Sequence, residues 1–319
     1  MNTILVTGGA GFIGSHLCGR LLNEGYRVIC LDNFDSYYDP SIKVKNVEGM
    51  VKNFPDRFEL ITGDIRNPEH LQGAFNKGPI RCVVHLAARA GVRPSIADPL
   101  LYQDVNIRGT VTLLEACKRS GIKDLIFASS SSVYGENQKV PFSEEDLNLY
   151  PISPYGATKR AGELLCYSYH HLYGLNTACL RIFTAYGPRQ RPEMAIHKFT
   201  RLIDRGEMIP MYGDGSSRRD YTYIDDLIEG ILGVLRYHKG FEVYNLGESR
   251  TTSLKELIQL IEGALGKKAK IDSLESQPGD VSITYADIRK AQDRLGYQPK
   301  VSMSEGIRRF VEWYKDRST

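Results

Sequence analysis

Short apolar runs alternate with stretches of helical periodicity along the first part of the chain. Apolar residues recur at helical spacing over 13–22 and 157–173, among other stretches. Six runs have the aliphatic or β-branched character of buried strands, and they lie at 3–7, 27–32, 58–62, 82–86, 124–129 and 177–182. Strands that alternate with helices are typical of a parallel sheet covered on both faces. The pattern therefore predicts an α/β fold with a doubly wound parallel sheet.

The pattern becomes less regular after Thr184. Turn-forming residues interrupt it at 186–188, 191–192, 210 and 213–215. Helical periodicity returns at 194–205, 225–236, 254–265 and 304–315. We expect a first domain over residues 1–184 and a smaller mixed α/β C-terminal lobe over 185–319. The stretch 221–246 can instead pack back on the first domain, so the boundary stays open.

Three glycines, Gly8, Gly11 and Gly14, lie where the first strand turns into the first helix. They fit a tight turn, a backbone close to a pyrophosphate and a helix packed on its strand, and the helix N-terminus offers N–H groups to phosphates. Asp32 ends the second strand about twenty residues on. A carboxylate there can accept both hydroxyls of an adenosine ribose and repel a 2′-phosphate. An ordinary turn would explain the glycines alone, but the combination predicts a Rossmann-type domain that binds NAD rather than NADP.

Composition limits the other functions. Over 319 residues, 42% are hydrophobic and 25% are charged, which is enough for a large core. A net charge of +3 without a basic stripe indicates no nucleic-acid partner. No apolar run approaches the ~20 residues of a membrane span, and the chain begins directly with a strand, so we expect a cytoplasmic protein without a signal peptide or membrane anchor. Six cysteines without a C-x-x-C pair indicate neither disulfides nor a metal site.

Tyr155 and Lys159 lie four residues apart on a predicted helix that Pro154 begins, so their side chains share a face. A free tyrosine has a pKa of about 10 and is a poor base at pH 7. A nearby ammonium favours the phenolate, and a tuned tyrosine can act as a general base. Four serines at 129–132 follow a buried strand and are expected to line the same cleft. A surface helix or a serine-rich loop would explain either feature alone; with the glycines they indicate a redox site.

Together these residues resemble the extended short-chain dehydrogenase/reductases that act on nucleotide sugars. The resemblance covers essentially the whole chain and includes the stretches 180–184, 186–188, 219–221 and 278–280. Within the family, the chain is most similar to UDP-glucuronate 4-epimerases, through the stretches 90–93 and 187–195. The resemblance implies NAD as cofactor and a UDP-sugar as substrate. It also implies a homodimer in which the helices around 103–118 and 155–173 pair with their copies.

The resemblance implies a role for each matching residue. Tyr155 would be the catalytic base, Lys159 would tune it and bind the nicotinamide ribose, and Ser130 would share a hydrogen bond with the sugar O4. The cofactor would be bound by Gly8, Gly11, Phe12, Ile13, Gly14, Asp32, Asn33, Asp64, Ile65, Leu86, Ala87, Ala88, Asn106, Tyr155 and Lys159. The substrate would be bound by Arg93, Ser130, Ser131, Ser132, Thr184, Arg191, Arg219 and Asp280.

The residues at 131 and 132 bear on the type of reaction. Sugar 4,6-dehydratases of this kind place Asp-Glu where Ser131-Ser132 stand, and related decarboxylases place Glu at Ser132. A serine hydroxyl has no suitable pKa for moving a second proton at C5 or C6. The resemblance therefore implies an NAD-dependent 4-epimerase that interconverts UDP-glucuronate and UDP-galacturonate by transient oxidation at C4.

Besides a net dehydrogenase or reductase that releases NADH, two other hypotheses stay open. The first is a 4-epimerase of UDP-glucose or UDP-N-acetylglucosamine, although glucose/galactose epimerases usually have Asn where Thr184 stands and Arg where Gln277 stands. The second is a non-catalytic, NAD-sensing Rossmann protein. Such a protein would have no physical need for Tyr155, Lys159 and Ser130 as a set.

Overall fold

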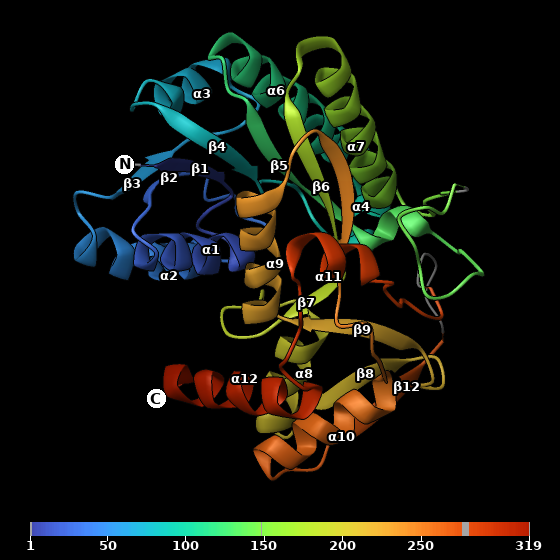
Figure 1. The fold of residues 1–319 in the computed structure, drawn as a ribbon. Helices are drawn as coiled ribbons and strands as arrows, with labels where there is room; N and C mark the ends of the chain where they lie inside the picture. The colour runs from blue at the N-terminus through green and yellow to red at the C-terminus, as the bar shows by residue number, and fades with distance from the viewer. Residues whose placement is uncertain (1, 148, 276–280, 319) are drawn as a thin grey trace.

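Seven parallel strands form the main sheet of the computed structural model, which describes residues 2–147, 149–275 and 281–318 (Figure 1). The strand order is β10-β6-β5-β4-β1-β2-β3, and every neighbouring pair is parallel. The strands are β1 (Thr3–Thr7), β2 (Arg27–Asp32), β3 (Phe58–Thr62), β4 (Ile80–His85), β5 (Asp124–Ser130), β6 (Asn176–Ile182) and β10 (Phe241–Leu246). The predicted doubly wound sheet is confirmed. Its strand order reverses between β1 and β4, the position at which such sheets bind ligands.

Helices cover both faces of this sheet (Figure 1). One face carries α1 (Phe12–Asn23), α2 (Pro40–Asn53) and α9 (Ile224–Tyr237), and the other carries α3 (Pro68–Phe75), α6 (Gly109–Arg119) and α7 (Pro154–Tyr173). Separate hydrophobic clusters fill the two interfaces. Burial on both faces explains why the strands are almost continuously apolar. The short helices near the carboxyl ends of β4 and β5 are α4 (Val92–Ala97), α5 (Pro99–Gln103), the π-helix η1 (Asp104–Arg108) and the 3₁₀ helix η2 (Ser131–Tyr134).

α9 and β10 follow Thr184 in the sequence but belong to the layers of the main sheet. β10 pairs with β6 over its whole length. α9 packs on α1 and is joined to it by ion pairs between Arg20 and Glu229 at 2.6 Å and between Arg236 and Glu24 at 2.9 Å. The chain therefore returns to the first sheet after it has begun the C-terminal lobe.

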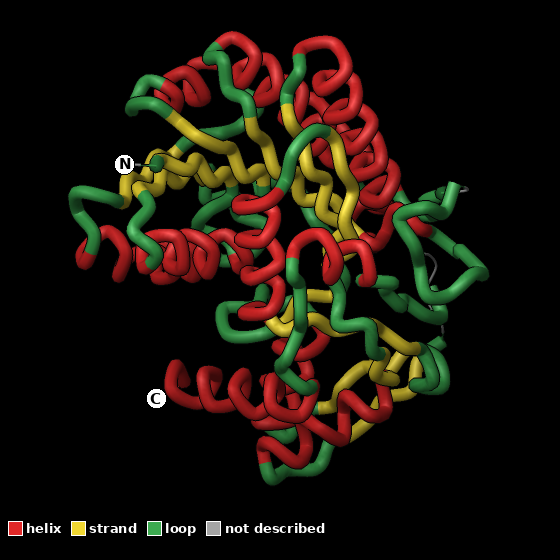
Figure 2. Tube along the Cα trace, in the orientation of Figure 1, coloured by secondary structure: helices red, strands yellow, loops and turns green. Residues whose placement is uncertain are grey.

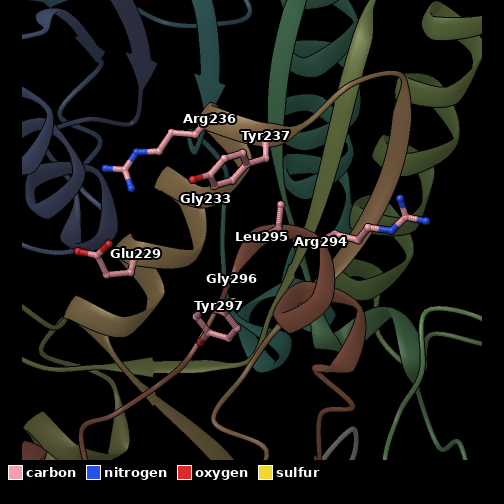
Figure 3. A pocket seen from close by; sticks show the side chains of 8 residues that line it. All are labelled: Glu229, Gly233, Arg236, Tyr237, Arg294, Leu295, Gly296 and Tyr297. Carbon is pink, nitrogen blue, oxygen red and sulfur yellow. The ribbon is translucent and has the colours of Figure 1, made fainter.

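A hollow of about 370 Å³ lies where α9 meets α11 (Arg289–Leu295) (Figure 3). The helices approach closely there, because a Cβ on Gly233 would lie 3.0 Å from the Leu295 carbonyl oxygen. Arg236 and Glu229 line the hollow and already pair with α1. The lining residues are Glu229, Gly233, Arg236, Tyr237, Arg294, Leu295, Gly296 and Tyr297. None of them is a predicted site residue.

Two smaller sheets form the C-terminal lobe, below the main sheet in Figure 2. The larger hydrophobic cluster continues into this lobe and includes Leu227, Phe199 and Phe310, so the two parts share one core. The strands are β7 (Thr184–Tyr186), β8 (Met208–Tyr212), β9 (Arg218–Tyr223), β11 (Thr251–Ser253) and β12 (Lys270–Leu274). The helices are α8 (Ala195–Asp204), α10 (Leu254–Leu265) and α12 (Met303–Ser318).

α7 has clear start and stop signals in the sequence. The Ser153 hydroxyl accepts from the Gly156 backbone N–H at 3.1 Å, and Pro154 occupies the first helical position. The helix ends at Gly174, which adopts a left-handed conformation with φ +66°. α7 carries Tyr155 in its first turn. Within the part of the chain that the structure describes, no helix is both long and apolar enough to cross a membrane.

Candidate active site

The turn between β1 and α1 is built from residues without a side chain. Gly8 has φ +70°, and a Cβ on it would lie 2.7 Å from the Ala87 backbone nitrogen. A Cβ on Gly14 would lie 2.2 Å from the Gly8 carbonyl oxygen, so both positions require glycine. Gly11 caps α1 without a side-chain hydrogen bond, and the first N–H groups of a helix have no partner within it. The first turn of α1 then holds Phe12, which is buried, and Ile13, which is half-buried.

Asp32, at the carboxyl end of β2, is buried and paired. Its carboxylate accepts from the backbone N–H groups of Ala10 at 3.1 Å and Phe34 at 2.9 Å. The Lys43 ammonium of α2 lies 3.6 Å from Oδ1. A carboxylate has about four acceptor sites, so ribose hydroxyls can still be bound. Lys43 nevertheless weakens the repulsion of a 2′-phosphate that Asp32 alone would exert.

Asp64 follows β3 and is held by a neighbouring arginine. Arg66 donates from Nε to Oδ1 at 2.9 Å and from Nη2 to Oδ2 at 2.7 Å, and these bonds hold the pKa of Asp64 well below its usual range. Asn33 donates to the same carboxylate at 3.0 Å. Ile65 is buried against Gly109, where a Cβ would lie 2.7 Å from Ile65 Cδ1. The structure thus brings Asn33 and Asp64 together beyond the ends of β2 and β3.

The carboxyl end of β4 lies beside the glycine turn. The Leu86 N–H donates to the Thr7 carbonyl at 3.1 Å, and the Ala87 N–H donates to the Thr7 hydroxyl at 3.3 Å. His85 lies 2.8 Å from the same hydroxyl through Nδ1. Burial lowers the pKa of His85 to about 3, so its ring is neutral at pH 7. Leu86 and Ala87 therefore lie at the switch point of the sheet, as expected for a cofactor edge.

Asn106 ties the segment after Ala88 to α7. Its Oδ1 accepts from the Arg89 N–H at 2.8 Å, and its Nδ2 donates to the Arg89 carbonyl at 3.0 Å and to the Thr158 hydroxyl at 3.0 Å. Thr158 in turn donates to the Tyr155 carbonyl at 2.8 Å. Asn106 is buried, so its amide fixes the backbone on both sides of the site.

Tyr155 is half-buried in the first turn of α7, and its phenol is hydrogen-bonded to Ser130. The Ser95 hydroxyl accepts from the Tyr155 backbone N–H at 3.1 Å, and the Tyr102 ring packs edge-on with 6.3 Å between ring centres. Burial raises the pKa of Tyr155, whereas the Ser130 hydrogen bond and the charge of Arg191 lower it. The geometry places a phenol and a hydroxyl together at the end of β5.

Lys159 lies one turn further along α7 and is buried. Its Nζ donates to the Ala128 carbonyl at 2.7 Å and lies 6.0 Å from the centre of the Tyr155 ring. Burial lowers the pKa of Lys159 to about 8. The sequence pointed to Lys159 as the cation that favours the Tyr155 phenolate. The structure adds a second cation, Arg191 of the C-terminal lobe, whose charge lowers the pKa of Tyr155.

The sequence predicts that the four serines at the end of β5 line one cleft. The structure instead separates Ser129 from the other three. Ser129 is buried and donates to Glu163 of α7 at 2.6 Å. Ser130 accepts from the Ser132 N–H at 3.1 Å and caps η2. Ser131 and Ser132 are half-buried in η2. Because successive strand side chains point to opposite faces, Ser129 and Ser130 have different partners.

Arg191 lies in the loop after β7, in the C-terminal lobe. Its guanidinium lies 5.5 Å from the centre of the Tyr37 ring and pairs with Glu193 at 3.2 Å. Its charge lowers the pKa of Tyr155. A charge from the second lobe therefore acts on the predicted base.

The other predicted substrate residues are spread over both lobes. The Arg93 guanidinium, on α4, lies 4.5 Å from the centre of the Tyr212 ring at the end of β8, so this contact bridges the lobes. Thr184 begins β7, and Arg219 lies on the neighbouring strand β9. Asp280 and Gln277 lie outside the described residues.

Residues 5–310 match the family model described as GDP-mannose 4,6 dehydratase. The chain belongs to the GDP-mannose 4,6 dehydratase family. This family membership confirms the resemblance to nucleotide-sugar enzymes of the short-chain dehydrogenase/reductase type.

Relatives of the chain in this family include epimerases. A UDP-glucuronate 4-epimerase of Thermodesulfobacterium geofontis is 43% identical over 317 residues, which cover 99% of this chain and 97% of the relative. The crystal structure of a UDP-glucuronic acid 4-epimerase from Bacillus cereus, in complex with UDP-glucuronic acid and NAD, is 42% identical with a TM-score of 0.90 over 99% of each chain. A UDP-glucose 4-epimerase from Thermotoga maritima, with UDP-glucose, is 35% identical with a TM-score of 0.92 over 99% of this chain and 100% of that one.

In this member of the GDP-mannose 4,6 dehydratase family, three side chains that the sequence did not indicate lie against the site. Tyr37 and Tyr102 hydrogen-bond each other through their side chains, and Tyr102 packs on Tyr155. The Arg89 guanidinium lies 4.6 Å from the centre of the Tyr37 ring. Tyr37 and Arg89 lie in two different loops, and Tyr102 lies on the short helix α5, so no periodicity indicates them. The adjacent aromatics Tyr37 and Tyr38, in a loop of polar residues, are the one signal that marked this region.

Proposed function

We propose that the chain is an NAD-dependent 4-epimerase that interconverts UDP-glucuronate and UDP-galacturonate. The observation that carries the proposal is the set of side chains around Tyr155. Ser130, Ser131 and Ser132 supply hydroxyls, and Arg191 supplies a cation. No carboxylate stands at 131 or 132, so this part of the site has no acid or base for a second proton transfer. The relatives from Thermodesulfobacterium geofontis and Bacillus cereus support the same substrate.

The chain fits NAD at the carboxyl end of β1. A Cβ at Gly8 or Gly14 would fill the turn, and Asp32 retains acceptor sites for a ribose. NAD, when bound, accepts the hydride from C4 and returns it. The cofactor is held by Gly8, Gly11, Phe12, Ile13, Gly14, Asp32, Asn33, Asp64, Ile65, Leu86, Ala87, Ala88, Asn106, Tyr155 and Lys159. The domain over 1–184 is thus the cofactor domain, joined by α9 and β10, and the lobe over 185–319 binds the nucleotide sugar.

Tyr155 is the general base in this proposal. Its phenol oxygen takes the proton of the sugar O4 and returns it after the sugar has turned. Ser130 holds the phenol and shares a hydrogen bond with O4. Arg191 and Ser130 favour the phenolate against the effect of burial. Lys159, anchored on the Ala128 carbonyl, holds the nicotinamide ribose.

The acidic sugar is bound by hydroxyls and cations. Ser131, Ser132 and Thr184 donate to the C6 carboxylate, and Arg191 faces either that group or the diphosphate. Glucuronate oxidised at C4 is a β-keto acid, which loses CO₂ when the C5–carboxylate bond aligns with the carbonyl π system. Fixed hydroxyls hold that bond out of alignment and leave no acid to protonate C5.

The remaining substrate residues act on the nucleotide. Arg219 contacts the diphosphate, and Asp280 binds the uridine ribose. Arg93 is a cationic partner at longer range and is held against Tyr212. Contacts far from C4 anchor UDP while the sugar turns between its two faces.

A second candidate is a UDP-glucose 4-epimerase, which the match to the Thermotoga maritima enzyme favours. A panel assay separates the two. The purified enzyme is incubated with UDP-glucuronate, UDP-glucose and UDP-N-acetylglucosamine, and C4 inversion is followed by chromatography. We expect UDP-glucuronate to react fastest, and Tyr155→Phe to be slower by about 10² or more. Faster inversion of a neutral sugar would overturn the proposed substrate.

A homodimer through α6 and α7 is also part of the proposal. Leu164 and Leu172 on α7 are 53% and 64% exposed, and Tyr167 is 52% exposed. Large apolar side chains that gather on one exposed face mark an interaction surface. The Tyr169 hydroxyl donates to Glu115 of α6 at 2.6 Å and ties the two helices together.

We place the enzyme in the cytoplasm. The argument rests on its thiols, because all six cysteines are buried and free, as suits a reducing compartment.

A further inference from the structure

α7 presents three side chains to the end of β5. Tyr155, Lys159 and Glu163 are spaced four residues apart, so they lie on one face of the helix. Tyr155 contacts Ser130, and Lys159 contacts the carbonyl oxygen of Ala128. Glu163 contacts the Ser129 hydroxyl. Three consecutive residues of the strand are thus each held by a different turn of the helix.

Glu163 is the most firmly held of the three. It is 1% exposed, and Arg181 of β6 donates to both carboxylate oxygens at 2.9 and 3.0 Å. Arg160 donates to the same carboxylate at 2.7 Å. A buried bidentate pair has little freedom to move. The Ser129 hydroxyl, 2.6 Å from Oε1, therefore binds an acceptor whose position is fixed by another strand.

Close backbone contacts keep α7 in this register. A Cβ on Gly162 would lie 2.3 Å from Cζ of Phe127, and a Cβ on Gly156 would lie 2.5 Å from the Ser132 carbonyl oxygen. α7 is thus packed closely against the Phe127 ring of β5 and against the backbone of η2.

We propose that Ser129 and Glu163 are positioning residues, which hold the Ser130 hydroxyl and thereby the Tyr155 phenol in their reactive arrangement. The inference rests on the proposed function, in which Tyr155 moves the O4 proton. Ser129 precedes Ser130 in β5. Without the hydrogen bond between Ser129 and Glu163, the end of the strand can move, and the Ser130 hydroxyl moves with it. Reaction rates fall steeply with small displacements of a catalytic group.

Ser129→Ala tests this link while the Glu163–Arg181 pair stays intact. We expect kcat for C4 inversion to fall by about 10-fold to 10²-fold, with KM for the UDP-sugar nearly unchanged. Ser129→Thr restores the hydroxyl and is expected to recover most of kcat. The matched control is Ser302→Ala, an exposed serine just before α12 whose hydroxyl accepts from the Glu305 backbone N–H at 3.3 Å.

A second readout does not depend on turnover. The protein is labelled with ¹³C at tyrosine Cζ, the Tyr155 signal is assigned with Tyr155→Phe, and its titration is followed by NMR. Because the Ser130 hydrogen bond lowers the pKa of Tyr155, Ser129→Ala is expected to raise that pKa. An unchanged Tyr155 pKa in Ser129→Ala overturns the proposal, whatever happens to kcat. Full turnover by Tyr155→Phe would instead overturn the proposed base, and the titration would still decide the role of Ser129.

Discussion

The ammonium of Lys159 donates to the backbone carbonyl of Ala128 at 2.7 Å, on the strand that also carries Ser130. Lys159 is 4% exposed, and burial lowers its pKa to about 8. The buried ammonium therefore lowers the free energy of unfolding, because it has lost most of its hydration.

Lys159→Met is expected to make the protein more stable at pH 7, by roughly 1 to 2 kcal/mol after the loss of the Ala128 hydrogen bond, while it abolishes most activity. The pKa of Lys159 is about 8 in the folded chain and 10.5 when unperturbed. Below pH 8 both states are protonated, and the destabilisation by wild-type Lys159 is complete. Between pH 8 and 10.5 the unfolded state binds more protons, so wild-type stability recovers as the pH rises.

Urea unfolding at pH 7 and pH 9.5 measures this difference. The advantage of Lys159→Met over the wild type is expected to shrink at the higher pH. Lys123→Met, at an exposed lysine, is the control. It should leave the free energy of unfolding unchanged at both pH values. A Lys159→Met protein that is less stable than the wild type at pH 7 would contradict the account.

Cofactor choice depends on Asp32 and Lys43 together. Asp32→Asn is expected to lower NAD affinity by about tenfold or more, because hydrogen bonds from the ribose to a charged acceptor are lost. It also leaves Lys43 without its partner at 3.6 Å, so NADP binding is expected to rise. Adding Lys43→Met should remove that gain. Calorimetric titration of each variant with NAD and NADP measures both effects, and equal wild-type affinity for the two cofactors would show that Asp32 does not hold the ribose.

Most strands and helices could be predicted from the sequence because their burial leaves a local pattern. β1, β2 and β3 have the predicted bounds, since strands buried on both faces are apolar throughout. β10 was not predicted as a strand. It has six residues, but they include Glu242 and Asn245 and its first half is only half-buried, so no continuous apolar run marks it. Its partner β6 lies about sixty residues earlier in the chain.

Parts of the candidate site were predictable where residues close together in the sequence determine their own relative positions. Tyr155 and Lys159 share a helix face through their spacing, and Gly8 and Gly14 must be glycine because of the turn. Partners from distant elements have no such signal. The pairing of Lys43 with Asp32 and the approach of Arg191 to Tyr155 both arise from tertiary packing. Spacing therefore indicated Lys159 as a cation near Tyr155, and it could not indicate Arg191.

Removal of the hydroxyls at 131 and 132 is expected to open a side reaction. In Ser131→Ala with Ser132→Ala, the C6 carboxylate of an oxidised glucuronate is held less firmly, so loss of CO₂ becomes competitive with epimerisation. Mass spectrometry should then detect a UDP-pentose that the wild type does not release. Ser143→Ala, in the loop after η2, is the control. A double variant that epimerises UDP-glucuronate at the wild-type rate, without a pentose, would remove these serines from carboxylate binding.

The proposed homodimer rests on the exposed apolar side chains of α7. Light scattering is expected to give the mass of a dimer for the wild type. Leu164→Glu with Leu172→Glu places two charges on the exposed apolar face and should give a monomer that still binds NAD. Glu48→Lys, on α2 at the opposite face of the sheet, is the control. A wild-type mass of one chain at all concentrations would rule out the dimer.

The fate of the C4 hydrogen tests the central claim most directly. UDP-glucuronate that carries deuterium at C4 is incubated with the wild-type enzyme in ordinary water, and the product is analysed by NMR and mass spectrometry. If oxidation and reduction take place at one carbon within one site, UDP-galacturonate retains the deuterium at C4 and acquires no solvent hydrogen at C5. Loss of the C4 label to solvent, or exchange at C5, would contradict a 4-epimerase that works by transient oxidation at C4.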